Sequence, residues 1–386
     1  MAAGPKNVRM RAAGRWLVLV AAVALAWPGK WSAWTALWLP ALSPYVAVGA
    51  AMAVRAVSVI SLLAVPVMCL VIISPRWFCR YACPTGFLQD LLGKFRPARP
   101  SWTRWPRIGR WLLVLTLGGA LAGYPIFLWL DPLALFNGFF HAWSQPFSAM
   151  LLVSAAGLPA LLLMTLLAPG LWCRRLCPLG ALQELLVRHP RTSAGPGRRE
   201  FMVAGAGAAG AWATGNLRTR RKPPLRPPGS VAEGRFVGVC VRCGNCVQVC
   251  PSHILHQDCG GHGIAGFLAP VVSFDGTDYC REDCIKCGLI CPSGAITSLT
   301  LTDKRARVIG SAAVNLQTCR LVNGGECTAC ISKCPYLALS IETSADGFFN
   351  MPLLDMTKCT GCGACEVACP VTPKAIRVTP GWGSLV

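Results

Sequence analysis

Sixteen cysteines in four short runs constrain the second half of this chain more than any other feature. Every run ends in Cys-Pro; the first and last have the spacing C-x2-C-x2-C-x3-C-P, and the middle two have a longer first gap. The runs are Cys240, Cys243, Cys246 and Cys250; Cys280, Cys284, Cys287 and Cys291; Cys319, Cys327, Cys330 and Cys334; and Cys359, Cys362, Cys365 and Cys369. A fold of this segment must therefore account for four sets of closely spaced thiols.

The spacing suits a cubane iron-sulfur cluster. Three cysteines at short intervals can wrap around three corners of the cubane, while the fourth, before proline, is directed toward a cluster held mainly by another run. Zinc sites prefer two separated C-x2-C pairs, and disulfide frameworks show no runs that end in Cys-Pro. The sequence thus predicts an α+β polyferredoxin domain over residues 234–386, with four ferredoxin-like units that hold four [4Fe-4S] clusters. Cys69 and Cys259 are expected to be spectators.

The positive charge of the chain lies almost wholly in its first part. Residues 1–233 contain 25 Lys and Arg against 5 Asp and Glu, and residues 234–386 contain 12 against 11, so the formal charges are +20 and +1. The basic part is also the apolar one, in a chain with 54% hydrophobic residues. Basic residues between apolar stretches are typical of loops beside a membrane, not of a nucleic-acid groove, so we expect no nucleic-acid partner.

Four apolar stretches predict transmembrane helices: Trp16 to Trp27, Val54 to Ile73, Trp111 to Leu130 and Ser148 to Leu171. Of the 20 basic residues before Phe201, 18 lie at the N-terminus or in the loops after the second and fourth stretches, which favours a cytoplasmic location for these segments. We expect an α-helical membrane domain over residues 1–190, with four transmembrane helices. The protein would then be a multi-pass protein of the bacterial inner membrane, in contact with lipid, with a periplasmic polyferredoxin domain.

An internal repeat joins the second and fourth apolar stretches. Residues 75–92 align with residues 169–186, and each copy contains C-x-x-x-C-P. The four cysteines are Cys79, Cys83, Cys173 and Cys177. Because cysteines four residues apart share one face of a helix, the repeat could bring all four thiolates to one further cluster or metal ion. A redox-active dithiol pair and inert packing are the alternatives.

Residues 191–233 separate the two predicted domains. Arg198 and Arg199 precede Phe201 and a short stretch of small residues, which is typical of a twin-arginine export signal; a fifth helix is the alternative. The stretch contains G-x-G-x-x-G from Gly205 to Gly210, but no strand leads into it, so we expect no nucleotide site. On the third apolar stretch, a G-x-x-x-G that ends at Gly123 indicates either close helix packing or small-residue filler.

The second part of the chain resembles the NapG/MauM family of exported four-cluster ferredoxins. The resemblance lies in Leu225-Arg-Pro-Pro-Gly-Ser and in the first cysteine run up to Pro251. The first part, with two C-x3-C-P motifs, is similar to the membrane core of NapH, MauN and NosR proteins, although it lacks the ferredoxin quartets that NapH carries after its last helix. The chain therefore resembles a fusion of two proteins that are usually encoded separately.

The resemblance implies a quinol dehydrogenase that relays electrons from the quinone pool to a periplasmic redox protein such as nitrate reductase. The alternative is an accessory factor that keeps a periplasmic metalloenzyme or its cofactor reduced during maturation. Quinol oxidation releases two protons with two electrons, so it needs proton acceptors. Asp131 and His141 are the candidates; otherwise, Asp131 ends a helix and His141 lies in the headgroup region.

Overall fold

The computed structural model describes residues 5–27, 29, 35, 37–74, 76–95, 106–143, 149–187, 198–218, 223–263, 266–343 and 350–380. The chain forms two compact units. Unit 1 comprises Met1–Arg220, Gly234–Gln248 and Ile290–Ala295, and unit 2 comprises Arg221–Glu233, Val249–Leu289 and Ile296–Val386. Unit 1 therefore contains the apolar part of the chain together with the first three cysteines of the first run and the last cysteine of the second.

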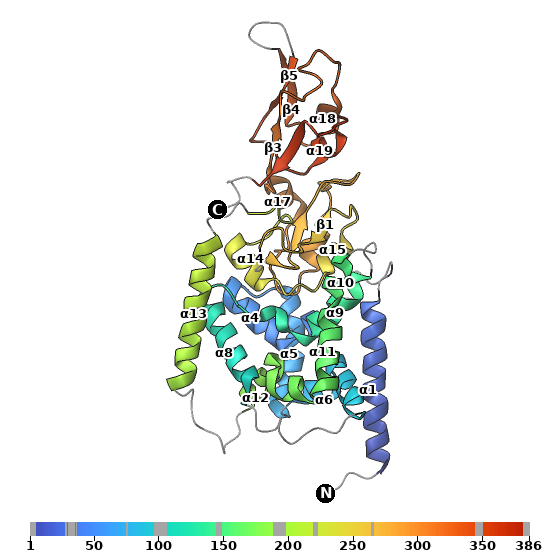
Figure 1. The fold of residues 1–386 in the computed structure, drawn as a ribbon, viewed down its shortest axis with the longest axis vertical. Helices are drawn as coiled ribbons and strands as arrows, with labels where there is room; N and C mark the ends of the chain where they lie inside the picture. Colours follow the sequence, from blue (N-terminus) through green and yellow to red (C-terminus); the bar gives the residue numbers. More distant parts are fainter. Residues whose placement is uncertain are drawn as a thin grey trace. The chain divides into compact units, whose positions relative to one another are not determined.

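Unit 1 is built mainly of short helices (Figure 1). They are α1 (Pro5–Ala26), α3 (Trp38–Ala41), α4 (Pro44–Val54), η1 (Val59–Leu63), α5 (Ala64–Ile73), α6 (Trp77–Tyr81), α7 (Pro84–Gly93), α8 (Ile108–Leu121), η3 (Leu128–Leu130), α9 (Pro132–Ala142), α10 (Ala149–Ala155), α11 (Gly157–Leu167), η4 (Trp172–Leu176), α12 (Pro178–Leu186), α13 (Arg198–Arg218), α14 (Glu233–Val239) and α15 (Asn245–Val249).

Four of these helices begin in the same way. Each has proline at its first position, where the missing N–H costs no hydrogen bond, and each is capped by the side chain of the residue before it. The capping residues are Ser43, Cys83, Asp131 and Cys177. The local sequence thus fixes two cysteines and one carboxylate at helix N-termini.

No helix of the described residues is long and apolar enough to cross a membrane. The two long helices, α1 with 22 residues and α13 with 21, each include four charged residues. Three of the four predicted spans are interrupted. Arg55, near the start of the second stretch, and Gly123, within the third, adopt a left-handed backbone conformation, and the last stretch is divided between α10 and α11. This finding contradicts the four predicted transmembrane helices and the multi-pass inner-membrane location inferred from them.

Helices α8 and α13 pack at short range because each presents glycine to the other. A Cβ atom on Gly118 would collide with the carbonyl group of Ala204, and one on Gly207 would collide with the carbonyl of Leu115. A Cβ atom on Gly119 would lie 3.5 Å from the Gly207 oxygen. The glycines of α13 that resemble a dinucleotide fingerprint therefore include one that is needed for helix packing.

Unit 2 contains three two-stranded antiparallel sheets among its described residues. The pairs are β1 (Leu255–Gln257) with β2 (Pro270–Val272), β3 (Ser311–Val314) with β6 (Ile376–Thr379), and β4 (Leu339–Thr343) with β5 (Asn350–Leu354). The short helices are α16 (Lys286–Leu289), α17 (Leu301–Ala306), α18 (Ala329–Ser332) and α19 (Ala364–Ala368).

The strand pairing divides the polyferredoxin segment into two similar modules. Module B comprises residues 311–379. There, β3, which precedes the third run, pairs with β6, which follows the fourth. Between them, β4, which follows the third run, pairs with β5, which precedes the fourth. Module A, residues 230–296, repeats this pattern with the bridge between Ser230 and Ile296 and with the β1–β2 pair. The four predicted cluster-binding units thus occur as two pairs.

The contact between α8 and α13 leads to a test with a matched control. Gly207→Ala should lower the thermal unfolding temperature, because its methyl group meets the Leu115 carbonyl. Gly205→Ala lies on the same helix with no atom within 4 Å of the new Cβ. There, the higher helix propensity of alanine should stabilise the protein by about 1 kcal/mol. Circular dichroism melting curves that coincide for the two variants would contradict this packing.

Candidate functional site

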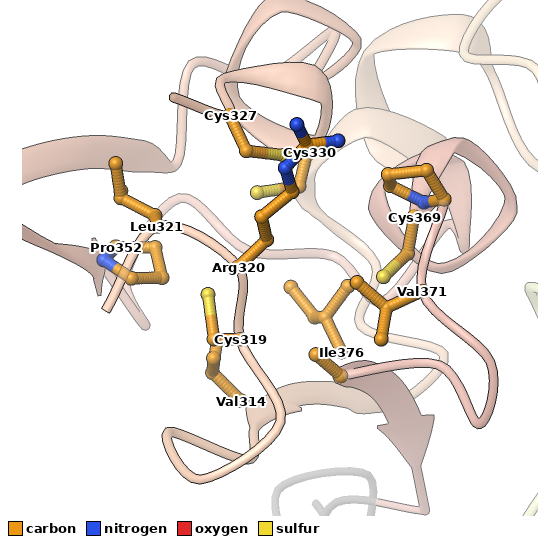
Figure 2. Close-up of a pocket in the computed structure, with 12 residues that line it drawn as sticks. Val314, Cys319, Arg320, Leu321, Cys327, Cys330, Pro352, Cys369, Val371 and Ile376 are labelled. Carbon is orange, nitrogen blue, oxygen red and sulfur yellow. The ribbon is translucent and has the colours of Figure 1, made fainter. Parts of the chain in front are cut away.

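Four cysteines from two different runs line one pocket in module B (Figure 2). Three belong to the third run, and Cys369 is the last cysteine of the fourth. The three are Cys319, Cys327 and Cys330. Aliphatic side chains, prolines and Arg320 complete the lining. The pocket therefore brings the last thiol of one run to the first three of another.

The reciprocal exchange occurs in the other half of module B. Burial is the largest cause that raises the pKa of the Cys365 thiol to about 12. The nearby charges of Cys362, Cys359 and Cys334 raise this pKa further, and Cys330 makes the smallest contribution among these cysteines. Cys334, the last cysteine of the third run, thus lies close to the first three cysteines of the fourth.

A group of the same kind lies in the part of module A that belongs to unit 2. Burial raises the pKa of the Cys287 thiol, and the charges of other cysteines raise it further. Those cysteines are Cys280 and Cys284 of the same run and Cys250 of the first run. The second run therefore has the last cysteine of the first run beside it.

The remaining group lies in unit 1. Burial raises the pKa of the Cys243 thiol, and the neighbouring charges of Cys291 and Cys240 add to the rise. Helix α9 holds this loop, because the Asn137 side-chain amide donates to the Cys243 carbonyl at 3.4 Å and to Asn245 Oδ1 at 2.6 Å. The first cysteine run is thus anchored to a helix of the apolar part.

Cys246 joins the unit 1 group by its place in the run, and four sets of thiols result. Site I comprises Cys240, Cys243, Cys246 and Cys291; site II comprises Cys280, Cys284, Cys287 and Cys250; site III comprises Cys319, Cys327, Cys330 and Cys369; and site IV comprises Cys359, Cys362, Cys365 and Cys334. Every site combines three cysteines of one run with the last cysteine of its neighbour. Such all-thiol sets have the ligand chemistry that a [4Fe-4S] cluster requires.

Sites II and IV adjoin inside unit 2. The backbone N–H of Cys280 donates to the carbonyl oxygen of Cys362 at 2.9 Å. Phe274 occupies the space where a side chain on Gly363 would stand, and Gly363 has a left-handed φ of 86°. Lys374 Nζ also donates to the Phe274 carbonyl at 3.1 Å. Modules A and B are therefore in contact inside unit 2, next to site II of module A and site IV of module B.

The four C-x3-C-P cysteines also come together, in unit 1. Cys83 Sγ accepts a hydrogen bond from the Gly86 N–H at 3.4 Å, and Cys177 Sγ accepts one from the Gly180 N–H at 3.5 Å. Burial raises the pKa of Cys83 to about 11 and that of Cys177 to about 12. These two thiols are therefore fixed at the N-termini of α7 and α12.

Their partners lie on α6 and η4. Burial raises the pKa of Cys79 well above its ordinary value, and the charges of Cys177, Cys83 and Cys173 raise it further. Cys173 is affected in the same way by burial and by the charges of Cys177 and Cys83. The two copies of the repeat thus place all four thiols within mutual electrostatic reach.

Asp131 and His141 both lie on α9 or at its start, and both are buried. Asp131 Oδ2 accepts from the N–H groups of Leu133 and Ala134 at 3.1 and 3.0 Å, and its Oδ1 accepts from Ser43 Oγ at 2.6 Å. Burial raises the pKa of Asp131 to about 6 and lowers that of His141 to about 4. The carboxylate thus serves as the cap of α9 and bonds to the residue that caps α4.

Other expected features have a plain outcome. Among the described residues, no three His, Cys, Asp or Glu side chains are placed to hold a single metal ion. Cys69 is exposed and Cys259 is partly exposed. Gln89 and Gln183 contact the C-x3-C-P thiols and were not among the predicted site residues, although the repeat aligns them at an offset of 94.

Two family models match the chain. One, described as a 4Fe-4S dicluster domain, matches residues 325–373, and the other, described as a 4Fe-4S binding domain, matches residues 54–102 and 150–195. Each of the two ranges matched by the second model contains one of the C-x3-C-P motifs. No solved structure matches the chain.

Several curated proteins are similar to about two fifths of the chain. The methylamine utilization ferredoxin-type protein MauM of Methylobacillus flagellatus is 39% identical over 178 residues, which cover 42% of this chain and 73% of the relative. MauM of Methylophilus methylotrophus is 37% identical, with coverage of 40% and 70%. The ferredoxin-type protein NapG of Escherichia coli is 34% identical, with coverage of 40% and 70%. The chain therefore belongs to the NapG/MauM family of ferredoxin-type proteins and is an iron-sulfur electron-transfer protein with [4Fe-4S] clusters.

Proposed function

We propose that the chain relays single electrons through four [4Fe-4S] clusters, each held by three cysteines of one run and the last cysteine of its partner run. The observation that carries this proposal is the pocket of site III, where Cys369 joins three cysteines of the preceding run. A bound cluster supplies a one-electron couple whose potential depends on its surroundings. The exchanges at the other three sites support the same arrangement.

Within unit 2, the proposed order of electron transfer is site II, site IV and site III. The hydrogen bond between Cys280 and Cys362 supports the first contact, because it links a ligand residue of one site to a ligand residue of the other. The influence of Cys330 on Cys365 supports the second contact. In this order site III, which contains the first three cysteines of the third run, is the last site on the path, although the fourth run is the last in the sequence.

The proposed electron donor is a quinol, and the proposed acceptor is a partner reductase of the kind that the NapG resemblance implies. The similarity to both NapG and MauM proteins supports a redox partner. The methylamine utilization names of two relatives favour a second function, in which the chain keeps a metalloenzyme or its cofactor reduced during maturation. Reduction of the purified protein by a quinol would favour the first function over the second.

The four C-x3-C-P cysteines are proposed to hold one further iron-sulfur group, in a NapH/MauN/NosR-like module joined to the ferredoxin part. Three observations support this: the thiols converge, Cys83 and Cys177 are buried, and both copies of the repeat match a family model described as a 4Fe-4S binding domain. A dithiol pair would need only two of the four cysteines.

Paired cysteine variants test the exchange between runs. Cys319→Ala with Cys369→Ala should remove one cluster, or about four iron and four sulfide, because both residues belong to site III. Cys365→Ala with Cys369→Ala should remove two clusters, or about eight iron, although both residues come from the same run. Iron and sulfide analysis of the full chain, with EPR of the reduced protein, gives the loss. A smaller loss from the second pair than from the first would overturn the exchange.

The quinol proposal has its own test at Asp131 and His141, which we propose as proton acceptors. Oxidation of one quinol gives quinone, two protons and two electrons, and the electrons leave singly. Asp131→Asn retains a capping side chain, so the fold should survive. We expect Asp131→Asn or His141→Gln to slow cluster reduction by quinol at least tenfold and to leave reduction by dithionite unchanged. Quinol kinetics equal to those of the wild type in both variants would remove these residues from the reaction.

A further inference from the structure

Two glutamines cross between the copies of the repeat to reach the opposite cysteines. Gln89 of α7, in the first copy, accepts a hydrogen bond at Oε1 from Cys173 Sγ of the second copy at 3.1 Å. Gln183 of α12, in the second copy, donates from Nε2 to Cys79 Sγ of the first copy, also at 3.1 Å. The two contacts are therefore equivalent under the repeat, except that the amide oxygen and nitrogen are exchanged.

Each glutamine keeps one polar atom without a hydrogen-bond partner among the described residues. The atoms are Nε2 of Gln89 and Oε1 of Gln183, and the residues are 4% and 0% exposed. A buried polar atom without a partner costs about 1–3 kcal/mol. The unpartnered Nε2 of Gln89 is a donor, so an acceptor at this cluster of thiols would complete its hydrogen bonding.

The charges around the site show which ligand chemistry would complete it. Arg76 places positive charge beside the thiols: its Nη1 donates to the Cys173 carbonyl at 3.3 Å, and its charge opposes the rise in the pKa of Cys79 and Cys173. Glu184 pairs with Arg76 at 2.9 Å and offsets part of that charge. Four neighbouring thiolates, two of them buried, would therefore need positive charge from a bound group and additional N–H donors.

We propose that Gln89 and Gln183 are a matched pair of N–H donors to Cys173 and Cys79 when these residues are thiolates bound to an iron-sulfur group. This inference rests on the further group proposed for the C-x3-C-P cysteines. A thiolate has no proton to donate, so the amide of Gln89 must turn to present its nitrogen, and the two contacts then become alike. Both glutamines would be positioning residues that stabilise negative charge on sulfur.

Such donors favour the reduced form of the group, because reduction adds one electron and makes the sulfur atoms more negative. Removing either donor should shift the ratio of reduced to oxidised group about tenfold toward the oxidised form at a fixed potential. For a one-electron couple this shift corresponds to about 59 mV. The symmetry of the two contacts predicts shifts of similar size, which should add in the double variant.

The test uses the full chain and begins by identifying the signal of this group. Cys79→Ser and Cys173→Ser should remove iron, and the difference in EPR between these variants and the wild type defines the group. Gln89→Leu, Gln183→Leu and the double variant are then titrated by EPR, and ENDOR measures the exchangeable protons that couple to the group. We expect lower midpoint potentials and loss of one exchangeable coupling per substitution. Leu185→Ala, an exposed position of α12, is the control and should leave both unchanged.

Two outcomes would overturn the inference and remain distinguishable. If Cys79→Ser and Cys173→Ser leave the iron content and EPR unchanged, the further group itself is absent and the pairing fails with it. If the group is present and the leucine variants keep its potential and proton couplings, only the role of the glutamines fails. Where a leucine variant loses the group, the equally sized Gln89→Glu and Gln183→Glu replace it, and a carboxylate beside the thiolate should lower the potential further.

Discussion

The demand of one cubane for four thiolates determines the architecture of the second part of the chain. Three closely spaced cysteines bind three corners, and the fourth corner needs a thiol from elsewhere. When each run gives its last cysteine to its neighbour, two runs must share one module. The antiparallel pairs β3–β6 and β4–β5 meet this demand in module B, because they join the segments before and after each run.

The repeat in unit 1 gathers four thiols by a different device. There, the second cysteine of each motif caps a helix that begins with proline, and its sulfur accepts the N–H of a glycine three residues later. The positive end of a helix favours negative charge on such a sulfur, while burial opposes it. The outcome depends on what the site binds, and Gln89 and Gln183 each bring the amide group of one copy to the first cysteine of the other.

Cysteine spacing was informative because three ligands of each cluster lie within fewer than twenty residues of the sequence. It predicted the cluster chemistry, and the repeat predicted that Cys79, Cys83, Cys173 and Cys177 could converge. It could not determine which runs are partners, because any last cysteine could reach any run until the strands fix the neighbours. Asp131 caps α9 through N–H groups two and three residues later, but its hydrogen bond from Ser43, 88 positions away, was invisible in the sequence.

Hydropathy misled the analysis for a physical reason. It counts apolar residues but does not detect a change in backbone direction, such as the left-handed residues after α4 and α8. The glycine pattern on α8 was closer to the structure: close packing does occur there, but through Gly118 and Gly119, whereas Gly123 adopts a φ of 87°.

Mössbauer spectroscopy of the full chain, prepared with isotopically enriched iron, distinguishes cubane clusters from other forms of bound iron. We expect the four cysteine runs to hold about sixteen iron atoms, all in cubane clusters that each take up one electron on reduction. Mononuclear iron, two-iron clusters or stoichiometric zinc at the runs would contradict it.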